Sequence, residues 1–235
     1  MRCDELDAVS IQIPTVEGPL ETRVIYDPAH EGPGGALLCP PHPLLAGNID
    51  NNVVMAIARC VAGAGLPVVA FNYRGVGASF QPDPSLPLFE AWSRLDAEGT
   101  YDGVVRDVEA AFGWAESMLG ALHVVAYSFG AFVAARSPRL RAAARSWSLI
   151  APPWGAHDFS GLADLATPCL LVSAEDDGLA ATGKAPTPDG TRRVVVPSSD
   201  HFFQGHEEEV GGAVAGFLSG RPTAAGRALP RTGGR

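Results

Sequence analysis

A serine, a group of acidic residues and a histidine each follow a stretch of the sequence that is typical of a buried strand. They occur along the chain in the order Ser128, then Glu175, Asp176 and Asp177, then His201. A serine hydroxyl is a poor nucleophile until a histidine accepts its proton, and the histidine needs a carboxylate that fixes its tautomer and stabilises the imidazolium. These residue types in this order therefore predict nucleophilic attack by Ser128 on a carbonyl group.

The position of Ser128 between a predicted strand and a predicted helix favours the same chemistry. Strand-forming residues precede it, and an alanine-rich stretch, residues 129–137, follows it. Such a turn lifts the hydroxyl clear of the sheet and leaves the first backbone N–H groups of the helix free to bind an oxyanion. We expect one N–H donor from Phe129 and a second from the loop around Leu44 and Leu45.

Strand and helix patterns alternate along the chain, which predicts an α/β fold with a mostly parallel central sheet and helices on both faces. In such a sheet, ligands bind at the carboxyl ends of the strands, so the serine, acid and histidine should meet at one edge. The predicted strands cover residues 8–15, 21–28, 34–40, 66–74, 122–128, 146–153, 168–175 and 192–199, and the predicted helices cover residues 52–65, 101–119, 129–137 and 207–220.

Three regions complete the predicted organisation. Residues 1–220 are expected to form one domain, with a lid-like insertion at about residues 80–100 that is rich in proline but also in large apolar side chains. Residues 221–235 have the Gly, Pro and Arg content of a disordered tail. Substrate contacts are predicted for His42, Leu45, Phe89, Trp92, Trp154 and Phe202, and a role for His42 in shaping the oxyanion loop is an equal alternative.

Two further polar residues are expected to serve the structure. Asp50 is expected to cap the helix that begins near Asn51, because an aspartate side chain can accept a free N–H at a helix start. Arg74, which precedes two glycines, is expected to tie loops together by hydrogen bonds.

The composition excludes several classes of partner. The formal net charge of -9 argues against binding of nucleic acid, which requires clustered Lys and Arg. No apolar run is long enough to span a membrane and the first residues do not begin a signal peptide, so a cytoplasmic location is expected. The four cysteines are widely spaced without a metal-ligand pattern, so free buried thiols and no metal are expected.

Five motifs together resemble a known family. LLCPPHPLLAGNIDNNVV, FNYRGVGAS, VVAYSFGA, LLVSAEDD and SSDHFFQG, in this order, are similar to small α/β-hydrolases and cover roughly residues 8–218. The likeness is closest to the cap-poor, dienelactone-hydrolase-like branch with an HPHP-type loop. The sequence departs from that pattern where Ala126 replaces the first glycine of Gly-x-Ser-x-Gly, where a proline replaces the first loop histidine, and where Ala46 replaces the first glycine of a Gly-Gly pair.

The resemblance assigns roles to individual residues. It implies that Ser128 is the nucleophile and His201 the base. Asp177 would be the acid, because Ala174 to Asp177 fits the spacing of the family's Gly-x-x-Asp pattern, with Asp176 as the alternative.

The expected function is that of a serine hydrolase acting on an ester or thioester of a hydrophobic or acyl substrate, through an acyl-enzyme and without a cofactor. The substrate would be a small molecule, either free or carrying its acyl group on a carrier. Two alternatives stay open at this point. The same site could serve an acyltransferase or cyclase that excludes water, or the chain could be a ligand-binding member of the fold without catalysis. The substrate and the oligomeric state do not follow from the sequence.

Overall fold

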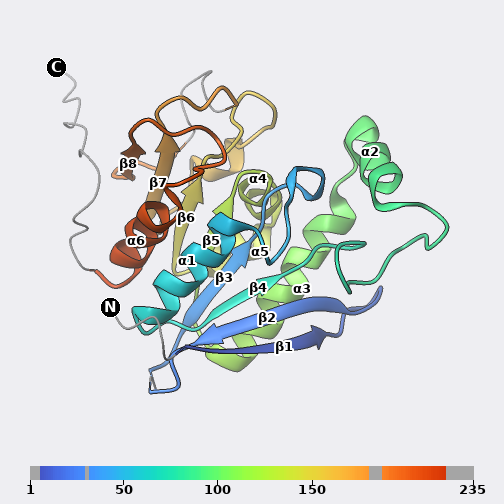
Figure 1. Cartoon of the computed structure of the whole chain (residues 1–235), viewed down its shortest axis with the longest axis horizontal. Helices are drawn as coiled ribbons and strands as arrows, with labels where there is room; N and C mark the ends of the chain where they lie inside the picture. The colour runs from blue at the N-terminus through green and yellow to red at the C-terminus, as the bar shows by residue number, and fades with distance from the viewer. Residues whose placement is uncertain (1–5, 30–31, 180–186, 221–235) are drawn as a thin grey trace.

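A single eight-stranded sheet organises the chain (Figure 1). The computed structural model describes residues 6–29, 32–179 and 187–220. The strand order is β1-β2-β4-β3-β5-β6-β7-β8, in which β2 runs antiparallel to both β1 and β4 and all the other neighbouring pairs are parallel. The strands are β1 (Asp7–Ile13), β2 (Leu20–Tyr26), β3 (Gly35–Cys39), β4 (Val68–Phe71), β5 (Leu122–Tyr127), β6 (Ser146–Ile150), β7 (Cys169–Ala174) and β8 (Arg192–Val196). The predicted α/β fold class and its mostly parallel sheet are confirmed.

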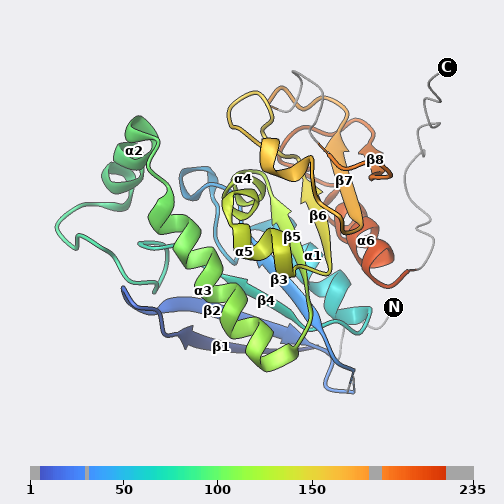
Figure 2. The same ribbon diagram turned by 180° about the vertical axis from the view of Figure 1, so that it is seen from behind.

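Helices cover both faces of the sheet. Helices α1 and α6 pack against each other on one face, and α3, α4 and α5 lie on the other (Figures 1 and 2). The α-helices are α1 (Asn52–Gly63), α2 (Leu88–Glu98), α3 (Asp102–Leu119), α4 (Phe129–Arg136), α5 (Pro138–Ala143) and α6 (Glu207–Leu218), and two short 3-10 helices are η1 (Pro43–Leu45) and η2 (Ser160–Leu162).

The central strands are apolar throughout because both of their faces are covered. Every residue of β3, β4, β5 and β6 is buried. A strand that buries both faces loses the alternation of polar and apolar residues that marks a half-exposed strand. Burial of these strands holds their carboxyl ends in fixed positions, and the loops that follow them carry the predicted site.

The start of α1 corrects one prediction. Asn51, and not Asp50, is the cap residue, since its side-chain oxygen accepts hydrogen bonds from the N–H groups of Val53 and Val54. Asp50 instead forms an ion pair with Arg23 on β2. The prediction was wrong by one residue, because Asn and Asp are about equally good caps and adjacent candidates cannot be separated by type alone.

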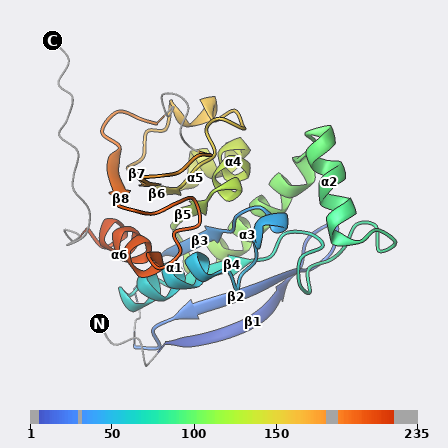
Figure 3. The same cartoon turned by 45° about the horizontal axis from the view of Figure 1, so that its top comes forward.

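The predicted insertion at residues 80–100 contains a helix that the sequence patterns did not indicate. Helix α2 projects beyond the sheet (Figure 3), and Trp92 is its buried residue. The loop before it is tied down by Arg74, which donates hydrogen bonds to both carboxylate oxygens of Asp107 on α3 and to Glu17. Arg74 therefore joins loops as expected.

Two other regions bear on the predictions. Among the described residues, none of the helices has the length and apolar character that a membrane crossing needs. The predicted disordered tail, residues 221–235, lies outside the described residues. Cys39 and Cys169 are free buried thiols, and Cys60 is buried as well.

Candidate active site

Ser128 occupies a sharp turn between β5 and α4. Its backbone has φ 52° and ψ -118°, a conformation that residues other than glycine rarely adopt. The strand still holds it, because its N–H donates to the Ile150 carbonyl at 2.8 Å, and the helix begins from it, because its carbonyl accepts from the Ala131 N–H at 2.9 Å. Its side chain makes no cap to the helix. The hydroxyl is therefore free to face another partner.

Small residues around Ser128 allow strand and helix to come this close. A side-chain carbon on Gly130 would lie 2.4 Å from the Cys39 carbonyl oxygen and 2.6 Å from that of Pro40, so only glycine fits there. Ala126 lies in β5 between Cys39 and Leu149 and is fully buried. The turn thus forms with alanine at the position where the family pattern has its first glycine.

Ser128, His201 and Asp177 form one chain of hydrogen bonds. The Ser128 Oγ and the His201 Nε2 are 2.8 Å apart, and the His201 Nδ1 lies 2.9 and 3.0 Å from the two oxygens of Asp177. A carboxylate only accepts, so the His201 proton is on Nδ1 and Nε2 can accept the proton of the serine. All three are buried, with 4%, 5% and 6% of their surfaces exposed for Ser128, His201 and Asp177.

The backbone around His201 is anchored from the strand that carries Ser128. The hydroxyl of Tyr127 donates a hydrogen bond of 2.9 Å to the carbonyl of His201. Burial raises the pKa of Tyr127, so this phenol keeps its proton and remains a donor. Strand β5 thus positions Ser128 through the backbone and His201 through the side chain of Tyr127.

Asp177, rather than Asp176, meets the histidine. The N–H of Asp176 bonds to the Ser199 carbonyl at 2.9 Å, which joins the loops after β7 and β8 and leaves the Asp176 side chain exposed. Asp177 is the next residue, and its Oδ1 also accepts from the Leu179 N–H at 2.9 Å. The loop pairing therefore directs one carboxylate to His201 and the other to solvent.

The two predicted oxyanion donors are in different situations. Phe129 is the first residue of α4, so its N–H has no carbonyl one turn earlier to bond within the helix. The Leu44 N–H instead donates to the ring nitrogen Nδ1 of His42 at 3.2 Å, and the Leu45 N–H donates to the His42 carbonyl at 2.8 Å. His42 therefore organises the loop that is expected to supply the second N–H donor to an oxyanion.

His42 has a partner that sequence reasoning missed. Its Nε2 lies 3.0 Å from Oδ1 of Asp96 on α2. Its ring packs edge-on against Trp92 and Phe129, with centroids 5.1 and 4.8 Å apart. Asp96 lies in an exposed, proline-flanked segment without a motif, so only the folded position of α2 reveals it.

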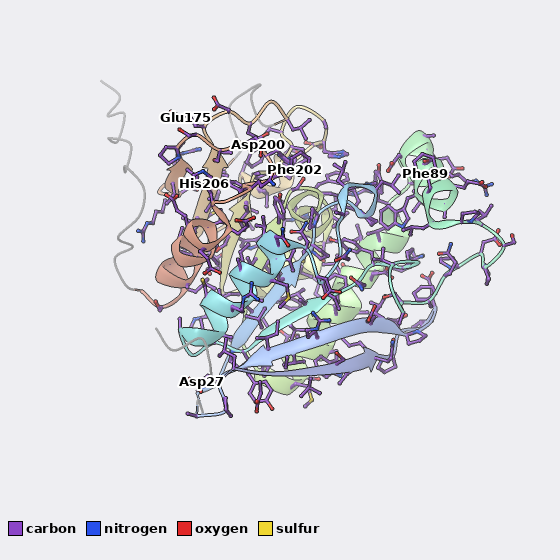
Figure 4. The ribbon with its side chains drawn as sticks, in the orientation of Figure 1. Asp27, Phe89, Glu175, Asp200, Phe202 and His206 are labelled. Atoms are coloured by element: carbon purple, nitrogen blue, oxygen red, sulfur yellow. The ribbon has the colours of Figure 1, made fainter. Side chains whose placement is uncertain are left out.

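The other predicted pocket residues do not form one cluster. Trp92 is buried, and Trp154 packs on Phe159 with ring centroids 4.6 Å apart. Phe202 is exposed and meets the His201 ring edge-on at 5.6 Å, whereas Phe89 is exposed on α2, well to the right of Phe202 in Figure 4. Leu45 is also exposed. Of the predicted contacts, Phe202 packs on His201, and both His42 and Trp92 pack on Phe129.

A cavity of about 500 Å³ lies elsewhere on the molecule. It is formed by the β1–β2 turn and helix α3, and its lining includes Val16, Trp114 and Arg139. None of the predicted site residues lines it, so the chemistry of Ser128 gives no reason to place the substrate there.

The sequence comparisons do not assign the chain to a family. No protein-family profile matches the chain. It is 27% identical over 227 residues to an uncharacterized protein of Rickettsia prowazekii, which covers 86% of this chain and 85% of that protein.

Solved structures give the clearer likeness. An α/β serine hydrolase homologue from Coxiella burnetii is similar with a TM-score of 0.72 and 24% identity, over 89% of this chain and 97% of that one. A serine hydrolase without a lid from Xanthomonas campestris has a TM-score of 0.72 and 25% identity, over 95% and 97% of the two chains. The chain has the α/β-hydrolase fold and is similar to serine hydrolases of the cap-poor kind.

Proposed function

We propose that this chain is a serine hydrolase that cleaves an ester or thioester of a hydrophobic or acyl substrate. The observation that carries the proposal is the 2.8 Å hydrogen bond between Ser128 Oγ and His201 Nε2, made from a backbone turn that holds the serine out of the sheet. The similarity in fold to serine hydrolases supports the reaction class. A serine that served only as a turn residue would have no need of a buried histidine and carboxylate behind it.

The reaction follows from the positions of these groups. Ser128 Oγ attacks the carbonyl carbon while His201 Nε2 takes its proton, and Asp177 stabilises the resulting imidazolium. The tetrahedral oxyanion accepts hydrogen bonds from the N–H groups of Phe129 and Leu44. His201 then gives its proton to the departing alcohol or thiol, leaving an acyl group on Ser128. Water, deprotonated by His201, releases the acid and restores the serine.

Apolar side chains beside the triad support a hydrophobic substrate. Phe202 follows the histidine, Leu179 follows the acid by two residues, and Leu45 belongs to the oxyanion loop, and all three are exposed. Exposed large apolar residues cost free energy unless they meet an apolar partner. Their placement on the three loops that carry the site favours an acyl or other apolar group next to the scissile bond.

Reaction with a fluorophosphonate tests the nucleophile directly. Intact mass should show a single adduct on the wild-type protein and none on Ser128→Ala, which has the same fold but no hydroxyl. An adduct that persists in Ser128→Ala would place the reactive group elsewhere. A folded wild-type protein that takes up no adduct would contradict the proposal.

A panel of esters and thioesters with increasing acyl length then tests the substrate class. Release of free acid identifies hydrolysis, and the specificity constant should rise with acyl length over the first few carbons. Transfer of the acyl group to an added alcohol or amine without release of acid would instead identify an acyltransferase.

A further inference from the structure

A second carboxylate–histidine pair lies next to the proposed oxyanion loop. Asp96 Oδ1 faces His42 Nε2 at 3.0 Å, and the same oxygen accepts a hydrogen bond of 3.0 Å from the hydroxyl of Tyr101. The pair is less buried than the triad, with 38% of the Asp96 side chain and 13% of the His42 side chain exposed. It is not part of the reaction described above, and it joins α2 to the loop that contains Leu44.

The two neighbours of His42 determine where its ring carries a proton. A carboxylate can only accept, so Nε2 must be the protonated nitrogen. The Leu44 N–H can only donate, so Nδ1 must be bare. Both contacts therefore require the same neutral tautomer, with the proton on Nε2 and a lone pair directed at the Leu44 N–H.

Tyr101 strengthens this arrangement from the start of α3. Burial and the neighbouring Asp96 raise the pKa of Tyr101 to about 12, so its hydroxyl stays protonated and donates to the carboxylate. Tyr101 also packs edge-on against Phe129, with ring centroids 5.2 Å apart. Tyr101 therefore holds the Asp96 carboxylate from one side, and the carboxylate holds His42 on the other.

We propose that Asp96 is a positioning residue that acts through His42 on the oxyanion hole, an inference that rests on the proposed hydrolase function. By accepting the Nε2 proton, Asp96 keeps Nδ1 bare, and Nδ1 fixes the direction of the Leu44 N–H. Without Asp96, the ring can adopt the other tautomer, in which an N–H at Nδ1 faces the Leu44 N–H and two donors oppose each other.

This arrangement favours the transition state over the bound substrate. A neutral carbonyl oxygen accepts a hydrogen bond about as well as the imidazole nitrogen, so it gains little by drawing the Leu44 N–H away from His42. A charged oxyanion is a stronger acceptor, by about a factor of two in hydrogen-bond energy. The Leu44 N–H therefore turns to the substrate only as negative charge develops, so that its contribution falls on the transition state and adds little to substrate binding.

Kinetics of Asp96→Ala test the proposal. We expect kcat for a good ester substrate to fall about tenfold while KM changes less than about twofold, a smaller loss than the 10²- to 10³-fold typical of a missing oxyanion donor. Asp96→Asn should keep most of the activity, since its amide oxygen still accepts from Nε2. Glu90→Ala removes an exposed carboxylate from the same helix and serves as the matched control. Unchanged kcat in Asp96→Ala would overturn the proposal.

A double-variant cycle tests whether Asp96 acts through His42. An asparagine in place of His42 can accept the Leu44 N–H as an ordinary cap residue, without a proton for Asp96 to hold. Asp96→Ala should therefore cost about tenfold in the wild-type background and less than about twofold in His42→Asn. Equal losses in both backgrounds would show that Asp96 acts by another route.

The tautomer of His42 can be read without any activity. Imidazole nitrogen NMR shifts distinguish protonated from bare ring nitrogens, and we expect His42 to be protonated at Nε2 in the wild type and to show a mixture of tautomers in Asp96→Ala. A proton on Nδ1 in the wild type would overturn the inference even if the enzyme is active. Absence of ester turnover with the expected tautomer would instead count against the proposed function.

Discussion

At the scale of single residues, the site depends on which of several similar side chains the fold selects. Glu175, Asp176 and Asp177 are consecutive acids after β7, and the backbone pairing of Asp176 with Ser199 turns only Asp177 toward His201. Glu175 accepts the N–H of Ser198 and so helps to hold the two loops together. Three equal-looking carboxylates therefore have three different environments.

Asp177→Asn should lower kcat by about 10³- to 10⁴-fold while leaving the fold intact, because an amide can donate to Nδ1 and favour the wrong tautomer of His201. Asp176→Asn is the matched control, one residue away and exposed, and should stay within about twofold of wild type. Steady-state kinetics with one ester would check both variants. A loss that follows Asp176 instead would mean that the loop adopts another register in solution.

The residues that could be predicted from the sequence and those that could not depend on different features of the chain. Ser128 and His201 lie directly after strands, so the sheet places them and their positions follow from local patterns. The contact between His42 and Asp96, and with it the proposed role of Asp96, depends on how two segments 54 residues apart approach each other. Such approaches are set by packing, which leaves no signature in spacing or composition.

At the scale of elements, the distance between β3 and α4 is set by Gly130. The first turn of α4 lies against the carbonyl groups of Cys39 and Pro40, which belong to backbone and cannot move aside as a side chain could. A residue with a side chain would force the helix, and the Phe129 N–H with it, away from the sheet.

Gly130→Ala should lower the free energy of unfolding by about 2 kcal/mol, the typical cost of overpacking a close contact, despite alanine's better helix propensity. Gly212→Ala in α6 is the matched control, since nothing lies within 4 Å of its added carbon, and it should raise stability by about 0.5–1 kcal/mol. Urea denaturation of both variants checks this. A stable Gly130→Ala would mean that α4 can shift without cost.

Helix α2 shows why an element can escape prediction. Its apolar residues Leu88, Trp92 and Leu95 are at helical spacing and pack against the core, but only Trp92 is buried, and the proline-rich stretch before them is typical of a loop. The central strands and helices α1 and α3 were predicted because they bury whole faces. The element that carries Asp96 was instead expected as an irregular lid or pocket wall.

At the scale of the whole molecule, a buried histidine links stability to pH. His123 lies in β5, 8% exposed, with its Nδ1 2.7 Å from Ser146 Oγ on β6. Burial, with a smaller effect from Arg145, lowers its pKa from 6.5 to about 4. The unfolded chain therefore takes up a proton between pH 6.5 and 4 that the folded protein does not bind.

The contribution of His123 to the free energy of unfolding should be fully present above about pH 6.5 and decline as the pH falls toward 4, by at most about 3–4 kcal/mol for a shift of this size. His123→Gln should lack this part of the pH dependence, although it lowers stability at neutral pH through lost packing. The measurement is the free energy of unfolding of both proteins from pH 4.5 to 7.5. Parallel curves would show that His123 is not the group responsible.

The proposed triad also makes the site a late product of folding. Ser128 and His201 are 73 residues apart, and their strands are separated in the sheet by β6 and β7. Parallel strands have no hairpins to pair them locally, so contacts of high contact order must form before the two side chains meet. A chain under synthesis can hold the serine turn but has no base for it until β8 and the following loop have joined the sheet. Reaction of Ser128 with a fluorophosphonate would then show that folding is complete.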